Sequence, residues 1–374
     1  FGTLLNRRSP NGIPVALNLE EPFCLVATGV QGSGKSHTIG TIVESCLMQM
    51  PPHINLRTPM SALVLHYDQA AVNPCECASL MRLKDDVRRS LLSKDGVEPS
   101  SLPKIKKCVV LTSPSYFLQR KAMYETLPDT EVRPLLFSFR SLDVAQLRVL
   151  MRFTSTDNQL YANMMMERLR AFQRRGGLPK YEDFRADITE YLDSEGAVTQ
   201  LQPLLQRLSL LDELIAESAV NSEKVHQLGN KSLNEAYGAL KLNELMEPGT
   251  MVIADISDSM LDTDAARGIF QILLENFRDF DVSHGKLCVL DEAHKYLDVN
   301  KKSGLTESIV YTVRMMRHYG IRVAISTQSP LTLPPEVLEL TKIAVCHKFF
   351  SRDWATHLAK KLPLSKSVSD VMTL

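Results

Sequence analysis

The sequence predicts an α/β fold in which a mostly parallel sheet is flanked by helices and interrupted by an inserted helical bundle. Three observations support it. A glycine-rich loop at residues 29–36 follows a short apolar run and precedes apolar residues at helical spacing. From residue 250 onward, short apolar runs alternate with segments of helix length, as in sheets of parallel strands. Between these two parts, residues 142–214 carry helical periodicity.

The composition limits what the chain can do. It has 374 residues and is 44% hydrophobic, which is enough for a large core. Lys+Arg and Asp+Glu number 43 each, so contact with nucleic acid or an anionic membrane must be local. No apolar run is long enough to span a membrane, and we expect no membrane contact. Because the chain begins with Phe1, we expect it to be a fragment of a longer product.

We expect residues 1–140 to form the N-terminal part of the core. Turn signals in residues 9–14 indicate a hairpin that precedes the core. Apolar runs predict strands over residues 23–28, 62–67, 109–111 and 135–139.

We expect residues 141–245 to form the helical bundle. It should contain about four helices, with breaks between helices near Gly176-Gly177 and Gly196. We expect residues 246–374 to form the rest of the core. Its strands are expected at 250–254, 287–290, 322–326 and 343–346, and its helices at 262–280 and 306–319.

The glycine-rich loop matches GxxxxGK[ST], the pattern of a P-loop. Its glycines let backbone N–H groups converge on phosphate oxygens, and the following helix adds its positive N-terminal end. The alternative interpretation is a chance glycine turn before a helix. It is disfavoured because strand, loop, GKS and helix all occur in the order that a P-loop requires. The loop therefore predicts binding of a nucleoside triphosphate. The residues expected to hold it are Gly29, Gln31, Gly32, Ser33, Gly34, Lys35, Ser36 and His37.

A second motif lies where the apolar run 287–290 meets Asp291 and Glu292. An Asp at the end of a buried strand orders Mg²⁺ in P-loop proteins, so Asp291 and the Ser36 hydroxyl are the expected magnesium ligands. Neighbouring residues at a strand end point differently, which leaves Glu292 to accept a proton from the attacking water. The alternative is a solvated acidic loop. A base beside Asp291 favours hydrolysis over phosphoryl transfer by a kinase.

The strand over 322–326 leads into Ser-Thr-Gln328. A glutamine there can contact the γ-phosphate and the attacking water, and so report the nucleotide state. The same residues are also ordinary turn material. The place of Gln328 immediately after the helix that follows Asp291 favours the functional interpretation.

The order of these motifs resembles the HerA branch of the HerA–FtsK ATPases. The P-loop, the Asp291–Glu292 pair, an arginine-rich helix, the strand that leads to Gln328 and residues 343–350 carry the resemblance, which spans nearly the whole chain. Asp255 is similar to an aspartate in a strand ahead of the Asp-Glu pair in that family. Asp-Glu-Ala-His also occurs in RNA helicases, but the wider helicase motif set is not apparent.

The resemblance implies a hexameric ring that hydrolyses ATP with Mg²⁺ and moves double-stranded DNA through its channel. It implies Lys35 on the phosphates, Glu292 as base and Gln328 as sensor. It also implies an arginine finger that acts on the neighbouring subunit. Arg317 is the preferred candidate and Arg314 the second, although either could be part of a solvated helix face.

Other features remain open. Asp68 departs from the Asp-x-x-Gly-Glu of the family, which puts its role in doubt. Lys301-Lys302 is the basic pair we expect to face DNA. Cys75 and Cys77, with His53 or His66, match no zinc spacing. Seven scattered cysteines favour an intracellular, reducing location, cytoplasmic or nuclear. The alternative function is a nucleotide-switched scaffold that recruits an effector, such as a nuclease.

Overall fold

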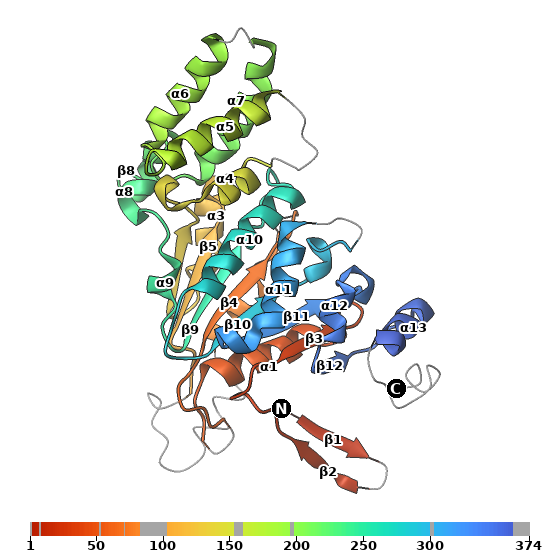
Figure 1. Cartoon of the computed structure of the whole chain (residues 1–374). Coiled ribbons are helices and arrows are strands. Elements are labelled where there is room, and N and C mark those ends of the chain that lie inside the picture. The colour runs from red at the N-terminus through yellow and green to blue at the C-terminus, as the bar shows by residue number, and fades with distance from the viewer. Residues whose placement is uncertain are drawn as a thin grey trace.

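In the computed structural model, residues 2–6, 9–51, 54–70, 72–82, 103–152, 160–194, 198–299 and 303–361 are described. An eight-stranded sheet, in the order β12-β3-β11-β10-β4-β9-β5-β6, forms the centre of the molecule (Figure 1), and all its pairings are parallel. The predicted α/β class with a mostly parallel sheet is confirmed. The strands are β3 Cys24–Thr28, β4 Ser61–His66, β5 Lys107–Thr112, β6 Thr130–Pro134, β9 Thr250–Asp255, β10 Lys286–Leu290, β11 Ile321–Thr327 and β12 Ile343–Cys346.

Side chains alternate between two hydrophobic cores, one on each face of the sheet. In β4, Leu63 and Leu65 face one core, and Ala62 and Val64 face the other. Helices α1 and α3 pack on the second face, while α10 and α11 pack on the first (Figure 1). Because both faces are covered, the six strands between the edge strands β12 and β6 are buried at almost every position. The helices on the two faces are α1 Lys35–Leu47, α3 Phe117–Tyr124, α10 Thr263–Asp279 and α11 Gly304–Tyr319.

Three helices, α5 Leu160–Arg174, α6 Tyr181–Ser194 and α7 Val198–Leu214, gather at one end of the molecule (Figure 1). Their buried side chains, including Leu169, Phe184 and Leu208, belong to the same hydrophobic core as the α10–α11 face of the sheet. The helical character predicted for this part of the chain is confirmed. The domain boundaries at 140 and 245 remain predictions.

The hairpin predicted at the N-terminus is formed by β1 Gly2–Asn6 and β2 Ser9–Val15, which pair with each other and extend away from the sheet (Figure 1). The remaining elements are short. They are α4 Val144–Leu150, β7 Lys224–Val225, β8 Lys231–Ser232, α8 Leu233–Tyr237, α9 Leu242–Leu245, α12 Pro335–Glu339 and α13 Arg352–Lys361.

The prediction of a strand over residues 135–139 is wrong. The strand is β6, immediately before it, where Val132 pairs with Val110 of β5. The apolar run instead packs toward the helices: Phe137 makes an isolated bridge to Ile215, and the Phe139 ring lies 4.7 Å from that of Phe184. Packing against a distant segment therefore outweighed local strand propensity.

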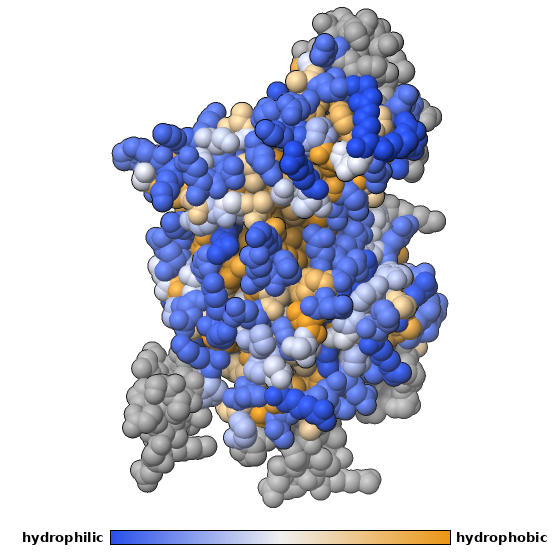
Figure 2. Space-filling view, turned by 60° about the vertical axis from the view of Figure 1, so that its left-hand side comes forward, coloured by the Kyte–Doolittle hydropathy of each residue, from blue (hydrophilic) through white to orange (hydrophobic). Residues whose placement is uncertain are grey.

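The face of the molecule shown in Figure 2 is mainly polar: hydrophilic residues predominate, and hydrophobic ones lie mostly toward its middle. Within the described residues, no helix combines the length and the apolar character needed to span a membrane.

Candidate nucleotide site

The predicted site residues emerge at one edge of the sheet. β3 lies between β11 and β12, β10 follows β11, and β4 follows β10. Thr28 pairs with Thr327, and Leu290 pairs with both Ile325 and Leu65. Because these strands are parallel, the residues that follow each of them meet at the carboxyl edge, where α/β proteins bind ligands. The P-loop, Asp291, Glu292 and Gln328 are brought together in this way.

The P-loop presents uncapped backbone N–H groups at the start of α1. Gly34 is the N-cap residue, with φ of 100°, and has no side chain to cap the first turn. Lys35 is only 4% exposed, and its Nζ donates a hydrogen bond to the Val30 carbonyl at 3.0 Å. A helix N-terminus with a buried lysine beside it suits a phosphate chain. Among the other predicted residues, Gln31, Gly32 and His37 are exposed, and Ser33 and Ser36 are half-buried.

The segment that follows β12, residues 347–350, is tied to the P-loop, and we name it the β12 strap. The His347 N–H donates to the Thr28 carbonyl at 2.7 Å, and the Val30 N–H donates to the Lys348 carbonyl at 3.0 Å. His347 Nε2 lies 3.1 Å from Thr38 Oγ1. Burial and the nearby Lys35 charge lower the pKa of His347, so its ring is neutral at pH 7.

Asp291 is a buried carboxylate with fixed partners. Its Oδ2 lies 2.9 Å from His66 Nδ1, and its Oδ1 accepts a hydrogen bond from Ser326 Oγ at 3.3 Å. Burial acts to raise the pKa of Asp291, but the His66 hydrogen bond and charge outweigh it, and the pKa is lowered. Asp291 is therefore ionised at neutral pH. An ionised oxygen ligand suits Mg²⁺, so the residue fits its predicted role.

Glu292 lies next to Asp291 in a different environment. Its backbone is left-handed, with φ of 47°, and its N–H donates to Ser326 Oγ at 3.3 Å. Gln328 Nε2 donates to Glu292 Oε2 at 2.8 Å, which brings the predicted base and the predicted sensor into direct contact. Burial, followed by the charge of Asp291, raises the pKa of Glu292. A carboxylate with a raised pKa at a strand end is suited to accept a proton.

His294 is a further part of this edge that the sequence did not indicate. Its Nδ1 accepts a hydrogen bond from the Gln328 N–H at 3.3 Å and lies 3.5 Å from Glu292 Oε2. Burial, with the charges of Lys295 and Lys35, lowers the pKa of His294 to about 4. The imidazole is therefore neutral, and its Nδ1 holds the backbone of Gln328 beside Glu292.

His66 and Ser326, which hold Asp291, were also missed. The available signal was their position: each lies at the carboxyl end of a strand that neighbours β10. His66, Cys75 and Asp291 place ligand atoms within 4.8 Å of one another, a set that could hold a soft metal ion such as Zn²⁺. His53, the other histidine considered for such a site, lies outside the described residues.

Asp68 has a supporting position. Its carboxylate lies 3.2 Å from Lys295 Nζ, and its N–H donates to Ser257 Oγ at 2.8 Å. Because these contacts connect β4 to the residues after β10 and β9, Asp68 braces the edge of the sheet.

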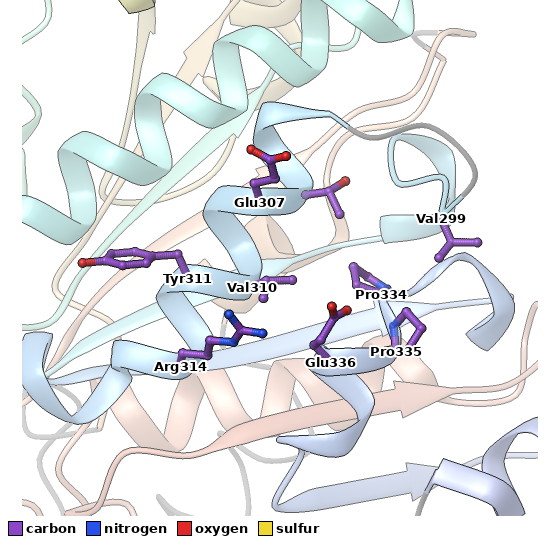
Figure 3. A pocket seen from close by; sticks show the side chains of 9 residues that line it. Val299, Glu307, Val310, Tyr311, Arg314, Pro334, Pro335 and Glu336 are labelled. Atoms are coloured by element: carbon purple, nitrogen blue, oxygen red, sulfur yellow. The ribbon is translucent and has the colours of Figure 1, made fainter.

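The two candidate arginines are exposed on α11. Within the described residues, no hydrogen bond or ion pair joins Arg314 or Arg317 to the P-loop or to the carboxylates of the same chain. Arg314 lines a pocket of about 560 Å³ between α11 and α12, and its guanidinium and the Glu336 carboxylate face the same space (Figure 3).

One basic cluster, at residues 104–107, is neutralised by nearby carboxylates. Lys104, Lys106 and Lys107 form ion pairs with Asp129, Glu247 and Glu131 respectively, as expected of a solvated face. Lys301-Lys302, the pair expected to face DNA, lies outside the described residues.

Gly29 is the position where a side chain would separate the strap from the loop. A Cβ there would lie 2.6 Å from the His347 Cβ and 3.2 Å from the Lys348 carbonyl. We expect Gly29→Ala to cost about 1–3 kcal/mol in unfolding free energy, and to speed hydrogen exchange at the Val30 amide. Gly229→Ala, where the added Cβ meets open space but the left-handed backbone is strained, is the control, and it should lose stability without faster exchange at the Val30 amide. Unchanged exchange in Gly29→Ala would contradict the strap contact.

No protein-family model matches the chain, and no curated protein matches it. Among solved structures, VirB4 of Thermoanaerobacter pseudethanolicus aligns over 97% of this chain and 89% of its own, with a TM-score of 0.50 and 12% identity. The bacterial conjugative coupling protein TrwB aligns over 91% of this chain and 67% of its own, with a TM-score of 0.43 and 14% identity. The genome packaging NTPase B204 from Sulfolobus turreted icosahedral virus 2 aligns over 36% of this chain and 63% of its own, with a TM-score of 0.28 and 18% identity. The chain has the fold of a P-loop NTPase, as the sequence predicts.

Proposed function

We propose that the chain is a Mg²⁺-dependent ATPase of the HerA–FtsK kind, which assembles into a hexameric ring and moves double-stranded DNA. The observation that carries this proposal is the contact between Glu292 and Gln328 at the same sheet edge as Lys35 and Asp291. A base paired with an amide, next to a phosphate-binding loop, is an arrangement for directing water at a γ-phosphate.

Each group has a role that follows from its surroundings. Lys35 leaves the Val30 carbonyl to pair with the β- and γ-phosphates. Ser36 and Asp291 would hold Mg²⁺, which supplies positive charge against the phosphates. Glu292 takes a proton from the attacking water, and the Gln328 amide orients the water and the carboxylate together.

The Glu292 role is tested by Glu292→Gln, which keeps the shape and removes the base. General-base catalysis contributes roughly 10²–10⁴-fold, so we expect turnover to fall about 100-fold or more while ATP binding changes little. Phosphate release and ATP affinity are the measurements. Glu125→Gln, at an exposed carboxylate that caps the C-terminal end of α3, should hydrolyse ATP normally. Full turnover in Glu292→Gln would remove the base assignment.

The arginine finger is tested by mixing two inactive variants. Arg317→Ala has an intact P-loop, and Lys35→Ala has an intact Arg317. If Arg317 acts on the neighbouring subunit, mixed rings regain ATPase activity that neither variant shows alone, because a finger raises turnover by several orders of magnitude.

Arg314→Ala, one helical turn earlier, is the matched comparison for the same mixture. Arg314 would be the finger if Arg317→Ala alone hydrolyses ATP normally and if Arg314→Ala regains ATPase activity only when mixed with Lys35→Ala.

The alternative function is a nucleotide-switched ring that recruits an effector, such as a nuclease, and does not move DNA. The balanced charge and the paired lysines on the described surface favour this candidate. ATPase rates with and without double-stranded DNA, at low and high salt, separate the two. A translocase should be stimulated, and the stimulation should fall as salt rises, because DNA contacts release counterions. Indifference to DNA would favour the effector-recruiting ring.

A further inference from the structure

The P-loop has two sides along the sheet, and they differ. β11 flanks β3 on one side, with β10 beyond it, and β12 flanks β3 on the other. Asp291, Glu292 and Gln328 all lie on the β11 and β10 side. A triphosphate whose γ-phosphate faces these groups must cross the end of β3. Its nucleoside is then directed toward β12.

The β12 strap stands where that nucleoside would lie. Its hydrogen bonds to Thr28 and Val30, at the two sides of Gly29, hold it against the loop. The His347 ring lies against Gly34, since a Cβ on that glycine would be 3.5 Å from Nδ1. The strap is therefore placed by the same backbone that holds the phosphates.

Two adjacent aromatic residues end the strap, and they have opposite surroundings. Phe349 packs against the hydrophobic core, with its ring 6.1 Å from that of Trp354. Phe350, the next residue, is 70% exposed, and Lys348 Nζ lies 5.1 Å from its ring centroid. Phe349 thus anchors the segment while Phe350 presents a ring to solvent.

We propose that the Phe350 ring is the stacking platform for the base of the bound nucleoside triphosphate, and that the β12 strap forms the nucleoside side of the site. This inference rests on the proposed function, because it takes the P-loop as the phosphate side. Every base has a flat face that can stack on an aromatic ring. The platform therefore selects nucleoside triphosphates as a class and discriminates weakly between bases.

The test compares a ligand that has a base with one that lacks it. Affinities of the full chain for MgATP and for inorganic tripolyphosphate are measured by calorimetry. Phe350→Ala should weaken MgATP binding about ten-fold, the effect of one lost base–aromatic stack, and leave tripolyphosphate binding unchanged. Phe350→Trp should keep the MgATP affinity, and Phe350→Leu should lose it although it keeps apolar bulk. Met260→Ala, at a distant residue that is 82% exposed, is the control for loss of exposed apolar surface.

Failure of this inference can be told from failure of the proposed function. Equal MgATP affinity in Phe350→Ala and the unaltered chain would overturn the platform alone, as would an equal loss for both ligands. Lys35→Ala should weaken both ligands, because it removes the phosphate contact they share. If the unaltered chain binds neither ligand, the proposed function fails and the platform fails with it.

Discussion

The parallel register of β4, β10, β11 and β3 is the constraint on which the site depends. Leu290 pairs with Leu65 on one side and with Ile325 on the other, so Asp291 emerges between His66 and Ser326. A shift of one residue would turn every side chain of β10 to the opposite face and remove Asp291 from both partners. The apolar alternation that fills the two cores therefore also sets the geometry of the edge. Stability and the arrangement of polar groups have one common cause.

This edge places two adjacent carboxyl groups in surroundings that shift their pKa values in opposite directions. Asp291 receives hydrogen bonds from His66 and Ser326 and has a lowered pKa, while Glu292 has a raised pKa through burial and the charge beside it. Pairs of acids whose surroundings separate their pKa values commonly divide their roles. Here the environment, more than the residue type, separates the two groups, as the roles proposed for them with a cation and with a proton require.

Much of this arrangement could be predicted from the sequence, because it depends on local patterns. Apolar runs locate seven of the sheet strands, and the GKS loop and the Asp-Glu pair mark two of the strand ends. The misplaced strand at 135–139 shows the limit of this method. Its leucines and phenylalanines form a local pattern that also suits packing against helices, and only the position of Ile215 and Phe184 decides between the two.

The supporting contacts could not be predicted for a related reason. His66 lies 225 residues from Asp291, and His347 lies 309 residues from Thr38. No periodicity connects such pairs, since their contact depends on strand order. The sequence places the predicted site residues at one edge of the sheet, but it does not reveal the residues that orient them.

The left-handed backbone of Glu292 carries an evolutionary consequence. A glutamate with φ of 47° stores about 1 kcal/mol or more of conformational strain that glycine would not have, and that asparagine would bear more easily. Chance substitution toward either residue would stabilise the fold at this position and remove the carboxylate. A lineage that retains Glu292 therefore does so against the direction that stability alone would favour. In drifting copies released from selection, this is among the first positions where a more stable chain that lacks the carboxylate should arise.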